Sequence, residues 1–324
     1  MKVCLDSVSY GGIFYKGPKV PLKDLIFKAK DFGYDGIEIQ ARRPLGSVLD
    51  WDSKAGKDLK ETADSAGIEI AAVSATNNFA SPIMEERENE LLMVREQIKF
   101  ANNMDAKVMR VFAAWMGTLG PDRRTGLATL ENTRITWNYP ASFVDRWLWV
   151  VDGLKEAAKW AEEYGVTLAL QTHGPILRPG YEDTLFMIRQ VNSEYLKMSL
   201  DTGLACFNQY EHQSDGYIRK AVQACKDVVV HSHFNAKFDE TPSGEVVQIP
   251  YDIPEVPGLT PPGGSTPNYL AFVRELKKIG YRGYHSYEVC SQERDENYNV
   301  IGIEMVDKYC RLACRYMKKL IREA

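Results

Sequence analysis

The chain has 324 residues, of which 44% are hydrophobic, 11% aromatic and 26% charged, and its formal net charge is −4. This length and composition are normal for one soluble α/β barrel. The net negative charge offers no basic surface for nucleic acid or for an anionic membrane. Residues 2–8 are too short and polar for a signal peptide, and no apolar run approaches the roughly 20 residues of a membrane span. We therefore expect a cytoplasmic protein with neither nucleic acid nor a membrane as partner.

Short apolar runs alternate with amphipathic segments from one end of the chain to the other. Strands are expected at residues 2–9, 33–39 (after a turn), 68–75, 107–115, 166–173, 196–201, 227–235 and 283–290. Helices are expected at residues 22–32, 52–66, 84–104, 142–164, 181–191, 217–225, 268–278 and 301–322. Two stretches that break this rhythm, 116–139 and 236–266, predict long irregular loops after the fourth and seventh strands.

Eight strand–helix units without a shift in composition predict a parallel sheet that closes into a (β/α)8 TIM barrel, with residues 1–324 as one catalytic domain. A doubly wound open sheet is the alternative. That fold would need a glycine-rich phosphate turn after the first strand, and Gly11 and Gly12 stand there without a G-x-G-x-x-G pattern. The six cysteines form no C-x-x-C pair, so we interpret them as reduced thiols.

Polar residues stand at the ends of the last four expected strands, where the catalytic residues of a barrel lie. Gln171 and His173 end the fifth strand, and because they are two residues apart they face the same side. The remaining polar strand ends are Asp201 on the sixth strand, His231 and His233 on the seventh, and Glu288 on the eighth.

One divalent metal ion bound by Gln171, Asp201, His233 and Glu288 would satisfy these groups together, because a buried acid needs a partner or a cation. Two carboxylates would neutralise the ion, and an imidazole and an amide oxygen would complete the shell. Such ligation suits Mn²⁺, Co²⁺ or Mg²⁺ better than structural Zn²⁺, although Zn²⁺ stays among the candidates.

Each of these residues also has a purely structural interpretation. Asp201 could cap the turn after its strand, and Glu288 could pair with Arg110 or Arg294. One histidine of the seventh strand could bond a backbone carbonyl in the core, but two at i and i+2 opposite acidic strand ends favour one ligand. His285 has the opposite parity to Glu288, so its side chain should point toward the helices.

Five motifs, in their order and spacing, resemble the xylose isomerase-like TIM barrels. They read G-Y-D-G-I-E-I, G-V-T-L-A-L-Q-T-H, L-D-T-G, H-S-H-F-N and H-S-Y-E, and they span essentially the whole chain. That group contains sugar phosphate isomerases and epimerases, inosose dehydratases and AP endonucleases of the endonuclease-IV type. The resemblance places the family's metal ligands on the same four residues, favours His233 over His231, and puts the family's second-strand glutamate, a catalytic candidate, on Glu38.

Two departures from the family's epimerases bear on the reaction. Gln171 stands where they have a glutamate, and Leu204 stands where they often have a histidine. An amide cannot take a proton, so a two-base mechanism would lack one base, and His173 is left as the proton acceptor. One base beside a Lewis-acidic metal suits enolisation followed by loss of a leaving group, which favours a lyase.

Among lyases, the resemblance points to the large subunit of C-glycoside deglycosidases, which release a C-linked aglycone from a 3-oxo-glucoside with the help of a small second subunit. Inosose-type dehydratase and sugar isomerase or epimerase are the alternatives. Substrate contacts are assigned to Arg110, His231, Trp115 and Trp137, and Tyr139 lies in the same long loop as Trp137.

Three other functions are weighed against this one. A trinuclear-zinc AP endonuclease would need more than five histidines and a basic face. A phosphosugar enzyme would need an anion site, for which the P-P-G-G-S run at 261–265 is a weak candidate. A non-catalytic sugar sensor would share the barrel and the metal. We also expect an oligomer, because the last helix has apolar residues enough for an interface.

Overall fold

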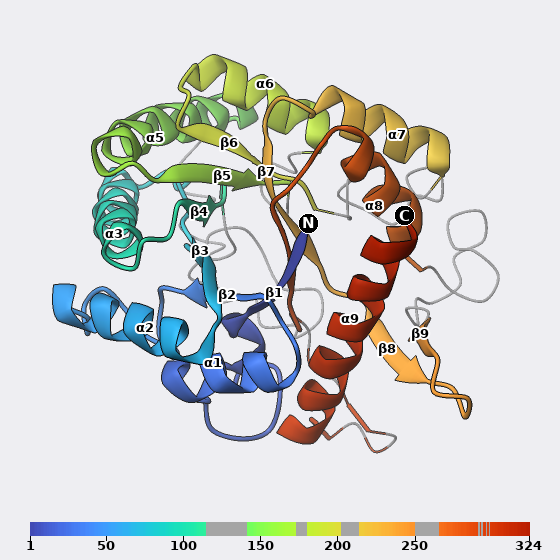
Figure 1. The fold of residues 1–324 in the computed structure, drawn as a ribbon. Helices are drawn as coiled ribbons and strands as arrows, with labels where there is room; N and C mark the ends of the chain where they lie inside the picture. The colour runs from blue at the N-terminus through green and yellow to red at the C-terminus, as the bar shows by residue number, and fades with distance from the viewer. Residues whose placement is uncertain are drawn as a thin grey trace.

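The computed structural model describes residues 1–114, 141–172, 180–201, 214–249, 266–290, 292, 294, 295, 297 and 299–324. Within them, eight parallel strands close into a barrel in the order β1-β10-β7-β6-β5-β4-β3-β2 (Figure 1). The strands are β1 (Lys2–Asp6), β2 (Gly36–Gln40), β3 (Glu69–Ser74), β4 (Val108–Val111), β5 (Thr167–Gln171), β6 (Leu196–Ser199), β7 (Val229–Phe234) and β10 (Tyr284–Tyr287). The predicted TIM barrel is therefore confirmed, and the open doubly wound sheet is wrong.

Helices surround the barrel and cover the outer face of its strands (Figure 1). They are α1 (Leu22–Asp31), α2 (Ser53–Ala66), α3 (Met84–Asn103), α5 (Phe143–Tyr164), α6 (Tyr181–Val191), α7 (Asp215–Ala224), α8 (Tyr269–Lys278) and α9 (Ile303–Glu323). Their ends lie within two residues of the expected ends. No helix of the described chain is long and apolar enough to cross a lipid bilayer.

The stretch expected to be irregular after the seventh barrel strand contains a β-hairpin, which corrects the prediction. Strands β8 (Lys237–Glu240) and β9 (Val246–Ile249) pair antiparallel. Pro242 lies in the turn between them and interrupts neither ladder, and Gly244 supplies the positive φ of +83° that closes the turn. Phe238 packs on Tyr316 of α9 with ring centroids 4.9 Å apart, so the hairpin is attached to the last helix.

The first strand is shorter than expected because its end bends into a 3₁₀ helix, η1 (Ser7–Tyr10). The carboxylate of Asp6 accepts a hydrogen bond from Val8 N over 2.9 Å and caps this turn. The carboxylate is thereby held at the carboxyl end of β1.

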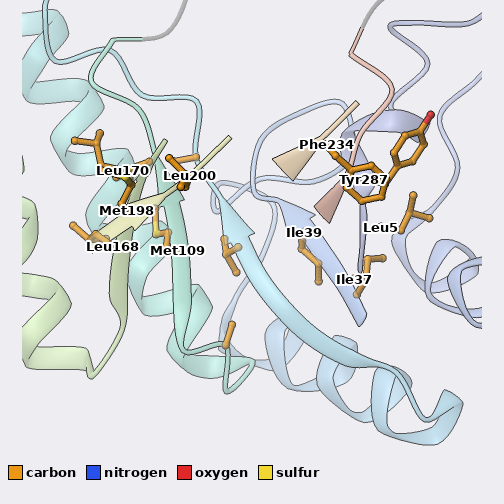
Figure 2. Close-up of a cluster of buried hydrophobic side chains, with 14 of the residues drawn as sticks. Leu5, Ile37, Ile39, Met109, Leu168, Leu170, Met198, Leu200, Phe234 and Tyr287 are labelled. Carbon is orange, nitrogen blue, oxygen red and sulfur yellow. The ribbon is translucent and has the colours of Figure 1, made fainter. Parts of the chain in front are cut away.

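The apolar core lies on the helix-facing side of the strands. Figure 2 shows part of it, and its members have the opposite strand parity to the polar residues that meet inside the barrel. The labelled members are Leu5, Ile37, Ile39, Met109, Leu168, Leu170, Met198, Leu200, Phe234 and Tyr287. The rings of Phe234 and Tyr287, from adjacent strands, lie 5.0 Å apart. Stability therefore comes from the layer between strands and helices, which leaves the interior of the barrel for polar side chains.

One close contact in that layer depends on a glycine. Gly153 of α5 lies against the ring of Phe79, and a Cβ built on Gly153 would lie 2.9 Å from the ring atom Cγ. Helix α5 itself begins with a capping box between Ser142 and Asp145 and ends at Gly165 in the left-handed region. The caps set the two ends of α5, and Gly153 allows its close approach to Phe79 after β3.

Candidate functional site

The inside of the barrel holds a connected group of buried polar side chains. Their contacts join strands that are not neighbours, which shows that these side chains cross the interior. Arg110 of β4 reaches Asp6 of β1, and His231 of β7 reaches Glu38 of β2. The group lies toward the carboxyl ends of the strands, where active sites of this architecture form.

Arg110 is the centre of this group, with a side chain only 4% exposed. Its Nε donates to Glu38 Oε1 over 2.7 Å, its Nη1 to Gln171 Oε1 over 2.7 Å, and its Nη2 to Asp6 Oδ2 over 3.1 Å. Burial opposes its charge, but the carboxylates of Glu38 and Asp6 outweigh burial and raise the pKa of Arg110. The guanidinium is therefore charged and holds three side chains at fixed angles. Arg110, expected to bind substrate, makes these three contacts with protein groups.

Glu38 accepts hydrogen bonds at both carboxylate oxygens. Oε1 accepts from Arg110, and Oε2 lies 2.8 Å from His231 Nε2 and 2.9 Å from His233 Nε2. Burial alone would raise the pKa of Glu38, but the charges of His233, Arg110 and His231 lower it well below its usual range. For His231, burial is the largest effect and lowers the pKa. Glu38 therefore stays ionised, accepts hydrogen bonds from its neighbours and is a weak base.

His233 is fully buried, and its Nε2 meets Glu38 Oε2 at 2.9 Å but outside the angle of a regular hydrogen bond. Its Nδ1 lies 3.6 Å from Glu288 Oε2. Burial disfavours the charged ring, but the neighbouring Glu38 outweighs it and raises the pKa of His233 to about 10. A buried imidazole in this situation calls for a proton or a metal ion, since buried polar groups are almost always satisfied.

Asp6, His233 and Glu288 each offer a ligand atom, and these atoms all lie within 4.8 Å of one another. The three residues come from β1, β7 and the end of β10, which are consecutive in the barrel. Burial, followed by repulsion from Glu38, raises the pKa of Asp6 to about 8. Two carboxylates and one imidazole form a donor set that fits a divalent ion, so the side chains present here suit the metal that we expected.

Gln171 and Asp201 belong to β5 and to the end of β6, the two strands that follow β7 around the barrel. The amide Nε2 of Gln171 donates to Asp201 Oδ2 over 3.0 Å, while its Oε1 faces Arg110. The backbone N–H of Asp201 donates to Thr172 Oγ1 over 2.9 Å. The four expected ligands come from, or directly follow, four strands adjacent in the barrel. The structure brings them together as two pairs, Gln171 with Asp201 and His233 with Glu288.

Asp6 was missed by the sequence analysis, which looked for metal ligands only at the ends of the last four strands. One signal for it was present, because L-D-S ends the first strand as L-D-T ends the sixth. In the barrel, Asp6 pairs in register with Glu38, so both acids lie at the same level of the interior. A second group, Cys4, Glu38 and His231, also brings its ligand atoms within 4.8 Å, but His231 and Glu38 already bond each other there.

Several expectations concern residues that the structure does not describe. His173, Trp115, Trp137 and Tyr139 lie outside the described residues, as does Leu204.

His285 points toward the helices as predicted. Its ring lies 6.2 Å from the ring of Phe272 on α8 and 5.8 Å from that of Tyr281. Burial lowers its pKa to about 3. The five described cysteines are free thiols, in agreement with the reduced state expected.

Comparison with known proteins agrees with this architecture. The family model described as xylose isomerase-like TIM barrel matches residues 26–309. Among curated protein sequences, none matches this chain significantly. Solved structures that resemble it include D-psicose 3-epimerase from Clostridium cellulolyticum H10 with D-tagatose, at 18% identity and a TM-score of 0.70 over 99% of both chains.

Two further solved structures share the fold. The apo form of 3-keto-D-glucoside 4-epimerase from E. coli is 16% identical, with a TM-score of 0.64 over 100% of both chains. An L-ribulose 3-epimerase is 14% identical, with a TM-score of 0.66 over 99% of this chain and 95% of that chain. At these identities the likeness concerns the fold.

Proposed function

Because this chain belongs to the xylose isomerase-like TIM-barrel family, we propose that it is a divalent-metal-dependent enzyme that isomerises or epimerises a sugar by enolisation beside a carbonyl. The observation that carries this proposal is the buried cluster of Asp6, His233 and Glu288, whose ligand atoms all lie within 4.8 Å of one another. Structures of the same fold whose names describe epimerases of ketoses and of a keto-glucoside support a sugar as substrate.

We propose that Gln171, Asp201, His233 and Glu288 hold the ion, and that Mn²⁺ suits them best because oxygen donors predominate. Such an ion, when bound, polarises a substrate carbonyl and stabilises the negative charge of an enolate. Gln171 Oε1 has a second lone pair beyond the one that accepts from Arg110. It can therefore accept this hydrogen bond and bind the ion at the same time. Asp201 and Glu288 supply the negative charge of the site.

The proton acceptor in this proposal is His173, two residues beyond Gln171. Gln171 itself cannot serve, because an amide has no basic site in this pH range. Glu38 has a different role here: its lowered pKa and its contacts with Arg110 and His231 make it the residue that orients the imidazoles. A single base is sufficient for proton transfer between adjacent carbons on one face of an enolate, which is an isomerisation. Epimerisation would in addition need a proton donor on the opposite face of the enolate.

A lyase is the second candidate, and Gln171 is the observation that favours it. Because Gln171 cannot act as an acid or a base, only one base is left. A single base also suits enolisation followed by expulsion of a leaving group, as in cleavage of a C-linked aglycone from a 3-oxo-glucoside. That reaction would bring a small second subunit as partner. Both candidates share the metal and His173, so they differ only in the fate of the enolate.

The experiment is incubation of the protein with ketoses, inosose and 3-oxo-glucosides in D₂O, after chelation and with Mn²⁺ restored, followed by NMR of the products. We expect Mn²⁺-dependent deuterium incorporation beside the carbonyl with formation of an isomer or epimer. Release of an aglycone or of water would instead establish the lyase. Sugar binding without exchange or product would make the protein a sensor and contradict both candidates.

Two variants sharpen this experiment. His173→Asn should abolish deuterium incorporation while Mn²⁺ still binds, because the ligands remain. Glu288→Gln should weaken Mn²⁺ binding itself. Unchanged exchange in His173→Asn would show that another group takes the proton.

A further inference from the structure

The carboxylate of Asp6 has no role in the site proposed above, although it lies in the same cluster. Strand β1 is next to β10, and β10 is next to β7, so Asp6, Glu288 and His233 stand side by side around one part of the barrel wall. Their nearest ligand atoms lie within 4.8 Å of one another, a spacing that allows one ion to contact all three. All three side chains are buried.

The charge of the interior supports a cation at this position. Among the described residues, four acids, Asp6, Glu38, Asp201 and Glu288, are buried inside the barrel, and their ion-pair partners include Arg110, His231 and His233. The two close ion pairs of Arg110 are with Glu38 and Asp6, at 2.7 Å and 3.1 Å. Gathering several acids in a buried place is costly, and a divalent ion would bring two positive charges to them at once.

The geometry of Asp6 is that of a supported ligand. Oδ1 accepts from Val8 N over 2.9 Å and Oδ2 from Arg110 Nη2 over 3.1 Å, which fixes the plane of the carboxylate. Each oxygen retains lone-pair capacity for a further contact, because an ionised carboxylate offers about four acceptor positions. Ligating carboxylates are commonly held in this way by groups behind them.

We propose that Asp6 is a ligand of the divalent ion together with His233 and Glu288, and that it supplies negative charge that the neutral Gln171 does not. This inference rests on the metal site of the proposed function and extends it to the first strand. Arg110 links the two residues, because it donates to Asp6 from Nη2 and to Gln171 from Nη1. The guanidinium therefore orients both donors from behind.

The test is titration of metal-free protein with Mn²⁺ by calorimetry and with Co²⁺ by visible absorption. We expect Asp6→Asn to weaken Mn²⁺ binding at least tenfold, since even residues behind the ligands change affinity by about 10–100-fold. Asp6→Ala should change the position and intensity of the Co²⁺ bands, because a donor atom is lost. Circular dichroism of each variant confirms folding, and Asp6→Glu should restore part of the affinity.

Arg110→Lys is the matched control, because it disturbs the support of Asp6 and leaves every proposed donor in place. It should weaken Mn²⁺ binding less than Asp6→Ala and leave the Co²⁺ bands near their wild-type positions. If Asp6→Asn binds Mn²⁺ within twofold of wild type, or Asp6→Ala has the wild-type Co²⁺ spectrum, Asp6 is no ligand while the proposed metal site stands. If the wild type binds neither ion, the metal site of the proposed function fails as well.

Discussion

Arg110 Nη1 donates to Gln171 Oε1 over 2.7 Å, and this contact decides which end of the amide faces Asp201. With the oxygen turned to the guanidinium, the Nε2 group donates to Asp201 Oδ2 over 3.0 Å. The reverse orientation would place two donors against each other and an oxygen against a carboxylate. A single buried arginine thus fixes the orientation of a proposed ligand and, through it, of a second one.

Gln171→Glu should make the stability of the protein depend more strongly on the metal. The new carboxylate would lose the hydrogen bond to Asp201 and lie beside it as a like charge. We expect the melting temperature of metal-free Gln171→Glu to fall below that of metal-free wild type, and Mn²⁺ to raise it by more than in wild type. Thermal unfolding with chelator and with excess Mn²⁺ measures both shifts, and equal Mn²⁺ shifts in the two proteins would contradict the prediction.

Arg110→Met should destabilise the fold by about 3–5 kcal/mol, because it leaves Glu38 and Asp6 buried without their cation. Arg146→Met is the control. Arg146 is also buried, but the structure gives its Nη1 the neutral carbonyl of Ala80 as acceptor, so its loss should cost about 1–3 kcal/mol. Urea unfolding of metal-free proteins gives both values.

The combination of Arg110→Met with Glu38→Gln tests the cause of that loss. Neutralising the carboxylate removes one uncompensated charge, so the double variant should be more stable than the sum of the two single losses implies. Strictly additive losses would show that the effect of Arg110 is packing rather than charge.

His285 should make the protein less stable in mild acid. Its pKa is about 3 in the folded chain, against about 6.5 when unfolded, because burial disfavours the charged ring. Between pH 6.5 and pH 3 the unfolded chain binds a proton at His285 that the folded chain does not bind. The contribution of the neutral His285 to the free energy of unfolding is therefore complete above pH 6.5 and is lost as the pH falls toward 3. At pH 5 the loss is about 2 kcal/mol.

The variant His285→Gln checks this dependence. The glutamine does not titrate, so the difference in unfolding free energy between pH 7.5 and pH 5 should be smaller in His285→Gln than in wild type by about 2 kcal/mol. Denaturant unfolding at the two pH values, with chelator present throughout, makes the comparison. Parallel pH profiles would mean that His285 accepts a proton within the fold.

Gly153→Ala should destabilise the protein by about 1–3 kcal/mol although alanine favours helices, because the new methyl group would meet Phe79 at 2.9 Å. Gly216→Ala in α7 is the matched control. A Cβ on Gly216 meets nothing within 4 Å, so this change should be neutral or stabilising by up to about 1 kcal/mol. Adding Phe79→Leu to Gly153→Ala should recover part of the lost stability. No recovery would show that the loss does not come from the contact between the new methyl group and Phe79.

The amino-acid sequence by itself determined the barrel, because the alternation of apolar runs and amphipathic segments is a local property that each unit carries. It also determined the polar strand ends Gln171, Asp201, His233 and Glu288, since the side-chain parity of a strand follows from residue number alone. The hairpin at residues 237–249 was missed because the prolines of the wider stretch 236–266 suggested a loop, whereas the hairpin itself contains only Pro242, which lies in its turn.

Only the tertiary structure decided which polar side chains contact one another inside the barrel. Closure of the barrel brings Arg110 of β4 to Asp6 of β1, 104 residues away, and His231 of β7 to Glu38 of β2, 193 residues away. Such contacts depend on the stagger of the strands and on the level at which each side chain enters the interior, and no local pattern records either. For the same physical reason, Asp6 became part of the cluster only when β1, β10 and β7 were placed side by side.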